Sequence, residues 1–196
     1  MAVRKIAEAG NPKLKAKNAV VANLKSPKLK KLIKDLEDTM YKTDLIGISA
    51  PQIAENYMVF ITHLRETAAR KLQKVDELRV FINPKITYKS KKQNEIYEGC
   101  GSLGGNVDNA GIFGPVIRPE EVEVVAFDAS GRKFRLRANG ILARVIQHEY
   151  DHLKGIEFIE KVPDLKRLVM ERHYRKYIRL SKKQIENSKV TRIEII

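Results

Sequence analysis

The chain has 196 residues, enough for one domain with a well-buried core and too few for two domains of ordinary size. Hydrophobic residues make up 43% and charged residues 32%, a globular composition, and no apolar run is long enough to cross a bilayer. We therefore expect a single domain over residues 1–196, with a basic C-terminal helix and tail over residues 166–196. The first eighteen residues lack the apolar stretch of a secretory signal, which favours a cytoplasmic protein without a membrane segment.

The net charge is +14, which gives the protein a general attraction for polyanions such as nucleic acid, the ribosome or membrane headgroups. The lysine excess does not choose between these partners, and a solvated, lysine-rich surface is the plainer explanation. Cys100 is the single cysteine, so an intrachain disulfide is excluded and the fold depends on packing.

The first clear element is an amphipathic helix that begins after Ser26. Ser26 is a favoured N-cap residue, and Pro27 is favoured in the first turn of a helix. Apolar side chains then recur at helical spacing, with lysines on the other side. These apolar residues are Leu29, Leu32, Ile33, Leu36 and Met40.

Short apolar strands are expected next. Residues 57–62 and 78–82 have the composition of buried strands, and the charged stretch 63–77 between them predicts a loop or a short surface helix. Residues 86–88 and 95–97 flank a polar run, which suggests a strand pair joined by a basic turn.

In the second half of the chain, the sequence pattern predicts a hairpin followed by two helices. Residues 121–126 and 133–137 form an antiparallel hairpin that turns at residues 128–131. A helix is expected from about residue 140 to Gly155, a plausible C-terminal stop. Another should run over residues 164–183, where basic residues greatly outnumber acidic ones. We rank packing on the domain as its first role, although basic and aromatic residues together also suit RNA or ribosome docking.

The most informative stretch lies in the first of these two helices. His148 and His152 are four residues apart and Glu149 follows the first, so a helix places all three side chains on one face. The helix's apolar stripe is centred next to Glu149, so this face is pressed against a core. Chance placement is the alternative, but only four histidines occur in the chain.

Two further segments have compositions that suit the lining of a metal or substrate site. A catalytic zinc-type or iron-type site needs a third protein ligand and an open position, and Cys100 is the obvious candidate. Gly99 and Gly101 let the backbone on both sides of Cys100 approach a metal without a side-chain clash. Earlier in the chain, residues 45–52 combine small and apolar residues with a proline and an amide, which indicates a tight segment close to another group.

In these three segments the sequence resembles the peptide deformylases, and the resemblance covers most of the chain. The segments occur in the family's order. They are Gly47-Ile48-Ser49-Ala50-Pro51-Gln52, Glu98-Gly99-Cys100-Gly101-Ser102, and Gln147-His148-Glu149-Tyr150-Asp151-His152-Leu153.

The resemblance implies an α+β fold in which antiparallel strands pack around the central helix that carries the His-Glu-x-x-His motif, with an N-terminal amphipathic helix and a C-terminal helix. It implies removal of the formyl group from the N-terminal methionine of new proteins. It also implies one divalent metal ion, Fe²⁺ natively, with Zn²⁺, Ni²⁺ or Co²⁺ able to occupy the site in a purified sample.

The resemblance also assigns roles to residues. The metal ligands are Cys100, His148 and His152. The catalytic groups are Glu149 as general base and acid, with the side-chain amide of Gln52 and the backbone N–H of Gly101 as oxyanion donors. The substrate-binding residues are Gly47, Ile48, Glu98 and Gly99.

Three positions depart from the family's usual pattern. The chain has Leu45 where the family usually has glycine, Ser49 where it has alanine, and Gly101 where it has leucine. Two alternatives therefore stay open. One is an amidase of the same architecture that acts on another acyl group, and the other is a weakly active relative that docks on ribosomal RNA. The sequence makes no prediction of the oligomeric state.

Overall fold

The computed structural model describes residues 2–67, 75–104 and 111–196. The helices are α1 (Pro12–Lys15), α2 (Pro27–Lys42), α3 (Gly140–Leu153), α4 (Glu171–His173) and α5 (Lys182–Ser188). The strands are β1 (Gly47–Ser49), β2 (Val59–Thr62), β3 (Arg79–Lys89), β4 (Gln93–Gly99), β5 (Ile112–Pro119), β6 (Glu121–Phe127), β7 (Lys133–Asn139), β8 (Val169–Met170) and β9 (Ile193–Ile195). The α+β class expected from the sequence is confirmed.

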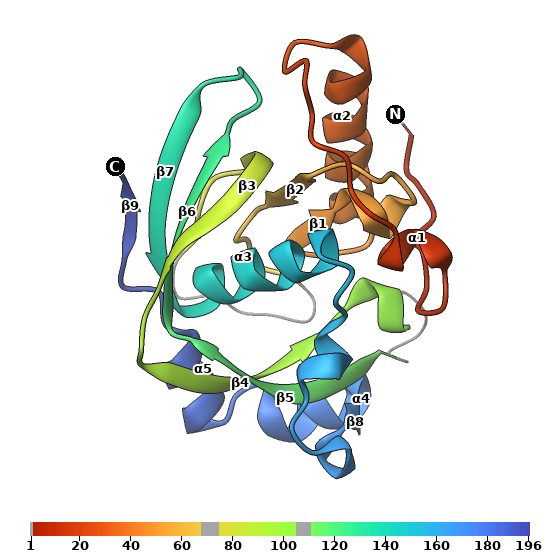
Figure 1. Cartoon of the computed structure of the whole chain (residues 1–196). Helices are drawn as coiled ribbons and strands as arrows, with labels where there is room; N and C mark the ends of the chain where they lie inside the picture. Colours follow the sequence, from red (N-terminus) through yellow and green to blue (C-terminus); the bar gives the residue numbers. More distant parts are fainter. Residues whose placement is uncertain (1, 68–74, 105–110) are drawn as a thin grey trace.

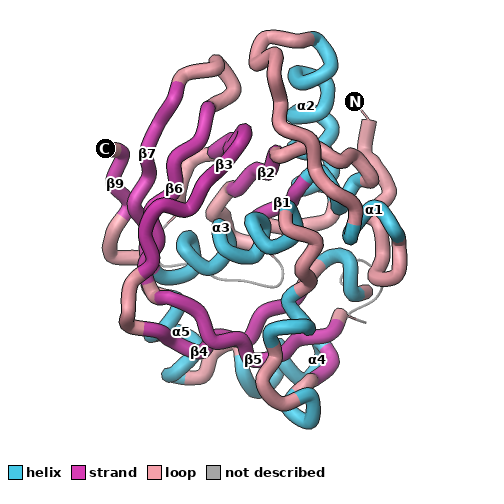
Figure 2. The backbone as a smooth tube through the Cα atoms, in the orientation of Figure 1, coloured by secondary structure: helices cyan, strands magenta, loops and turns pink. Residues whose placement is uncertain are grey.

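Two antiparallel sheets lie on either side of α3 (Figure 1). The larger sheet has the order β1-β2-β3-β6-β7-β9, and the smaller one has the order β4-β5-β8. The tube view shows the same arrangement, with α3 between the strands of the two sheets (Figure 2). The central helix therefore has strands on both sides, and side chains from both sheets can reach it.

The larger sheet separates two parts of the apolar core. Phe60 and Phe81 stack at 4.5 Å on the face that packs against α3. Their neighbours Ile61 and Ile82 point to the opposite face, where α2 covers the sheet. Successive strand residues point to opposite faces, so these apolar runs supply both core regions.

The N-terminal helix and the hairpin match their predictions. Ser26 caps α2, because its side-chain oxygen accepts a hydrogen bond from the Leu29 N–H at 3.2 Å. Strands β6 and β7 form the predicted hairpin, with Val124 opposite Leu136. Among the described residues, no helix has both the length and the apolar character to span a membrane.

The predicted pairing of residues 86–88 with residues 95–97 is wrong. Residues 86–88 belong to β3, which pairs with β6, whereas residues 95–97 belong to β4, which pairs with β5. Strand β3 continues past Pro84 because its register shifts there and Asn83 adopts a φ of 51°. Such a bulge accommodates a residue without a backbone N–H.

The single helix expected over residues 164–183 is also wrong. The segment contains the short 3-10 helix Leu165–Arg167, then β8, α4 and a π-helical turn over Tyr174–Ile178, and α5 begins only at Lys182. Residues Val169 and Met170 extend because they pair with β5, and this pairing interrupts the helical pattern.

The stretch 63–77 lies partly outside the described residues. In its described part, the Arg65 guanidinium donates to Asp44 Oδ1 at 3.0 Å and to the Leu45 carbonyl at 3.1 Å. Arg65 thereby holds the turn that leads into β1. Residues 105–110 also lie outside the described residues, and strand β5 begins at Ile112.

Gly140 opens α3 at a position where only glycine fits. Its φ is +60°, and a Cβ there would lie 2.2 Å from the Lys189 carbonyl oxygen. We expect Gly140→Ala to lower the free energy of unfolding by about 3 kcal/mol, from left-handed backbone strain plus the clash. Urea denaturation would measure the loss.

Gly10→Ala is the matched control, because Gly10 also has a positive φ, of +96°, and nothing lies within 4 Å of a Cβ there. This variant should lose only about 1 kcal/mol. Equal losses in the two variants would show that the contact with Lys189 contributes nothing.

Candidate active site

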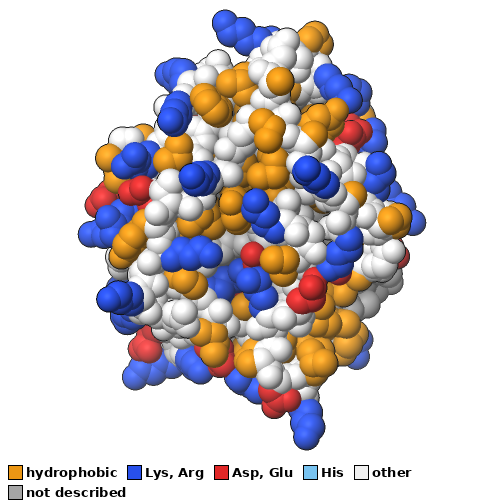
Figure 3. All heavy atoms as spheres, in the orientation of Figure 1, with side chains coloured by type: hydrophobic (Ala, Val, Ile, Leu, Met, Phe, Trp, Pro, Cys, Tyr) orange, Lys and Arg blue, Asp and Glu red, His pale blue; other side chains and the backbone are white. Residues whose placement is uncertain are grey.

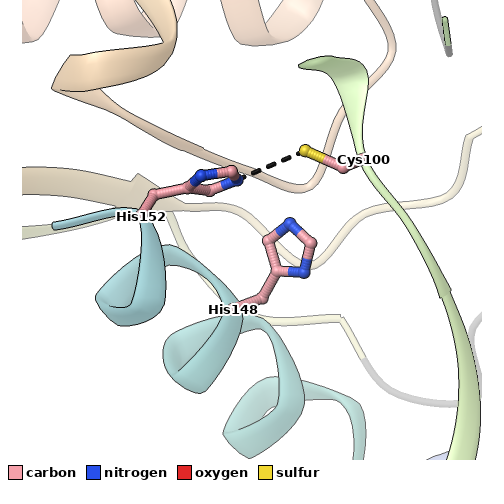
Figure 4. Close-up of side chains that lie close together, drawn as sticks. All are labelled: Cys100, His148 and His152. Carbon is pink, nitrogen blue, oxygen red and sulfur yellow. Dashed lines mark hydrogen bonds between the residues drawn. The ribbon is translucent and has the colours of Figure 1, made fainter. Parts of the chain in front are cut away.

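Three side chains of metal-ligating type converge between α3 and the end of β4. Cys100, His148 and His152 are all buried, and their candidate ligand atoms lie within 4.8 Å of one another. Cys100 Sγ is 3.2 Å from His152 Nε2, and the close-up shows the three side chains pointing into one space (Figure 4). The helix brings the two histidines together one turn apart, and the chain after β4 brings the cysteine.

The surroundings of Cys100 favour a thiolate. The backbone N–H of Ser102 donates to Sγ at 3.4 Å, and Gln52 Nε2 donates to it at 3.5 Å. Burial alone would raise the pKa of the Cys100 thiol, but His152 and His148 outweigh burial and bring the pKa well below its ordinary value of 9.0. A thiolate is the form of cysteine that ligates metals.

Glu98 orients His148 from behind. Glu98 Oε2 lies 3.0 Å from His148 Nδ1, which leaves Nε2 to face the space shared with Cys100. Burial would raise the pKa of the Glu98 carboxyl, but the charge of Arg118 and the hydrogen bond to His148 hold it well below 4.5. Glu98 also accepts from Arg118 Nε at 2.7 Å and from Arg144 Nη1 at 2.9 Å.

Glu149 has the environment of a proton acceptor. It is only 3% exposed, and its Oε2 atom is buried without a hydrogen-bond partner among the described residues. Burial raises the pKa of this carboxyl above its ordinary 4.5. Gly47 lies against it, since a Cβ there would be 2.8 Å from Glu149 Oε1. A glycine is therefore required at this point of β1.

Gln52 is held with its amide nitrogen toward the cluster. Its Oε1 atom accepts hydrogen bonds from the Ser49 backbone N–H at 2.8 Å and from Ser49 Oγ at 2.9 Å. Because both donors bind the carbonyl end, the NH₂ end faces Cys100. Two imidazoles, a thiolate and a buried carboxylate with one unsatisfied oxygen fit a divalent transition metal with an open position for water.

A cavity of about 220 Å³ reaches this cluster. Most of the residues singled out from the sequence line it, namely Gly47, Gln52, Glu98, Gly99, Cys100, Gly101, His148 and Glu149. Ile48 does not line it, because its side chain is fully buried in the core beneath α2, so a substrate could meet only its backbone. His152 ends the cluster on the inner side, at 1% exposure.

The cavity also contains residues that the sequence analysis did not single out. Its apolar lining includes Phe113, Ile141 and Val145, and its charged lining includes Arg144 and the pair Glu171–Arg175. Arg144 had a visible signal, since it lies four residues before His148 in the apolar stripe of α3. Glu171 and Arg175 had no such signal in the sequence, because their approach to the cavity depends on the pairing of β8 with β5.

Comparisons with known proteins identify the family. Residues 3–168 match the family model described as polypeptide deformylase. A chloroplastic peptide deformylase 1B of Solanum lycopersicum is 39% identical over 160 residues, which cover 82% of this chain and 53% of that protein. A peptide deformylase of Natranaerobius thermophilus is 36% identical over 165 residues, which cover 84% of this chain and 96% of that protein.

A solved structure supports the same assignment. The crystal structure of a plant peptide deformylase superposes with a TM-score of 0.72 at 35% identity and covers 84% of this chain and 83% of that one. This chain spans about half the length of the tomato protein but nearly the whole of the Natranaerobius protein. The model match and these similarities together show that the chain belongs to the polypeptide deformylase family.

Proposed function

We propose that this protein is a metal-dependent hydrolase that removes the formyl group from the N-terminal methionine of newly made proteins. The observation that carries the proposal is the buried carboxylate oxygen of Glu149, which has no partner in the described part of the chain and lines the same cavity as Cys100 and His148. Membership of the deformylase family supplies the reaction class. Formylmethionyl nascent peptides are the proposed substrates.

Cys100, His148 and His152 would hold the metal, and Fe²⁺ is the ion that we propose for the native enzyme. Zn²⁺, Ni²⁺ and Co²⁺ suit the same donors in a purified sample. When bound, the metal would polarise the formyl carbonyl and make water reactive near neutral pH. The hydrogen bond from Glu98 would keep His148 in the tautomer that a ligand requires.

The protein's own groups would then direct the proton transfers. Glu149 would accept a proton from the attacking water and return it to the amine that leaves. The Gln52 amide, fixed by Ser49, and the backbone N–H of Gly101 would donate to the oxyanion, each worth on the order of 3 kcal/mol in comparable sites. The apolar wall of Phe113, Ile141 and Val145 would receive the methionine side chain.

The glycines at the rim would bind substrate through their backbones. Gly47 and Gly99 both line the cavity, and a side chain at Gly99 would meet the Phe113 ring at 2.6 Å. Glu98 also lines the cavity, but its carboxylate is bonded to Arg118, Arg144 and His148. We therefore propose that Glu98 orients His148, one of the proposed metal ligands, and does not itself bind the substrate.

The cytoplasm is the compartment that we propose, although the tomato relative is named as chloroplastic. Ribosome docking is supported only by charge, and the lysine and arginine side chains on the face in Figure 3 are spread over it rather than gathered in one patch. We likewise propose that residues 1–196 form one domain. An amidase acting on another acyl group has support only from the missing side chain at Gly101.

Glu149→Gln should keep the metal but lower turnover by about a thousandfold, because an amide cannot accept the proton. Formate release from a formylmethionyl peptide, measured without air on Fe²⁺-loaded protein, would give the rate. Tyr150→Phe, on the next residue of α3, is the matched control and should keep its activity. Wild-type turnover in Glu149→Gln would remove this carboxylate from the mechanism.

Removal of the metal by a chelator should abolish turnover, and one equivalent of Fe²⁺ per chain should restore it. Since the metal binds the folded chain, loading at one hundred times its Kd should stabilise the fold by about 2.7 kcal/mol. Formate release would measure the turnover, and chemical denaturation would measure the stabilisation. Calorimetric titration would give the Kd of the metal. Cys100→Ala should bind the metal much more weakly; equal affinity in this variant would rule out the thiolate as a ligand.

A further inference from the structure

Part of the cavity wall comes from a segment outside the family match. The matched region ends at residue 168, yet Glu171 and Arg175 line the same cavity as Cys100 and Glu149. Strand β8 brings them there, because Met170 pairs with Ile112 and the Glu171 N–H donates to the Gly111 carbonyl at 2.6 Å. The C-terminal segment is therefore a structural part of the cavity.

Packing holds this segment against the site. Tyr174 is 2% exposed, and its ring stacks on Phe113 with centroids 4.0 Å apart. Gln184 accepts a hydrogen bond from the Tyr97 N–H at 3.0 Å and donates to the Tyr97 carbonyl at 3.2 Å. These contacts on both sides of Arg175 fix the backbone that carries it.

Glu171 determines which way the Arg175 guanidinium points. Its Oε1 atom accepts from Arg175 Nε at 2.8 Å and from Nη2 at 2.5 Å. The Glu171 side chain is 6% exposed, whereas that of Arg175 is 31% exposed. A guanidinium has five N–H donors, and among the described residues Arg175 uses only Nε and Nη2, which leaves the Nη1 donors for a ligand. The pair therefore presents to a ligand the outer edge of a fixed guanidinium, whose charge Glu171 partly balances.

Arg144, another cation of the cavity lining, is more deeply buried than Arg175. Arg144 is 3% exposed and is bonded to Glu98 and to Asn94 Oδ1, at 2.9 and 2.7 Å. Under the proposed function, formylmethionine must occupy the part of the cavity beside Cys100 and Glu149. Because Arg175 lines the same cavity, the residues that follow the methionine are the candidates for contact with it. A carboxylate is the group that a guanidinium binds best, through two parallel hydrogen bonds.

We propose that Arg175, oriented by Glu171, is a specificity-determining residue that favours formylmethionyl chains with an acidic side chain at the second or third position. The inference rests on the proposed function. It adds a preference that comes from this chain's own C-terminal segment. Because Arg175 is partly exposed, the preference is moderate and weakens with salt.

The test compares six peptides, in two series of three, that differ in the side chain at the second or the third position. Formyl-Met-Xaa-Ala and formyl-Met-Ala-Xaa, with Xaa as Glu, Gln or Lys, are assayed for formate release on Fe²⁺-loaded enzyme. In at least one series, kcat/KM should be about fivefold higher for Glu than for Lys, mainly through KM, and the ratio should fall at high salt. Arg175→Gln should bring the ratio close to one, and Arg175→Glu should reverse it.

Arg172→Gln is the matched control. Arg172 lies on α4, three residues before Arg175, and is exposed and not part of the cavity lining, so the variant loses the same charge but should keep the wild-type ratio. A ratio near one in the wild-type enzyme overturns the proposal. So does a ratio that Arg175→Gln leaves unchanged, or one that Arg172→Gln lowers equally.

Binding without turnover separates this inference from the proposed function. If no formyl peptide releases formate, the proposed function fails, and calorimetry with the same six peptides lacking the formyl group then decides the role of Arg175. Tighter binding of the Glu peptides that is lost in Arg175→Gln supports the inference. Equal binding of the Glu, Gln and Lys peptides overturns it.

Discussion

The site depends on the buried charge network around Glu98. One carboxylate on β4 bonds Arg118 on β5 and both Arg144 and His148 on α3, and Arg118 also pairs with Asp151 on α3. An unpaired buried ion costs several kcal/mol, so these groups must stay together. The two arginines are matched by two carboxylates, Glu98 and Asp151. The network thereby fixes the smaller sheet relative to the helix.

That constraint sets the geometry of the cluster of Cys100, His148 and His152. Cys100 follows Glu98 by two residues, so a sheet held at Glu98 delivers the thiol to a defined place beside the histidines. The two histidines are held differently. Glu98 fixes His148 through Nδ1, whereas His152 Nδ1 is buried without a partner among the described residues. The bonds that orient His152 are thus those on its Nε2 side, where Cys100 lies.

The parts of the fold and site that the sequence predicted are the local ones. The spacing of His148 and His152 on α3, the Ser26 cap of α2 and the β6–β7 hairpin each depend on residues close together in the chain. The strand pairing of residues 86–88 was wrong because the true partner, β6, is 35 or more residues away, and pairing energy does not appear in a single strand's pattern.

The charge network around Glu98 was not predicted, for the same reason. Nothing near Glu98 in the chain indicates that Arg118 and Arg144 converge on it from 20 and 46 residues away. A single helix was predicted for the C-terminal segment because its residues suit a helix. Val169 and Met170 are extended instead, because they pair with β5. Tertiary contacts overrode local propensity at both places.

The three departures from the family pattern lie at positions that hold or line the site. Ser49 gives Gln52 a second donor, which alanine could not supply, so the amide is held more firmly. Leu45 is half-buried beside the α2 core, and Arg65 holds its carbonyl. Gly101 gives up a wall side chain, and Phe113, backed by Tyr174, lines the same cavity. The apolar surface near residue 101 thus comes from Phe113 on β5, and the C-terminal segment adds the ion pair of Glu171 and Arg175 to the same cavity.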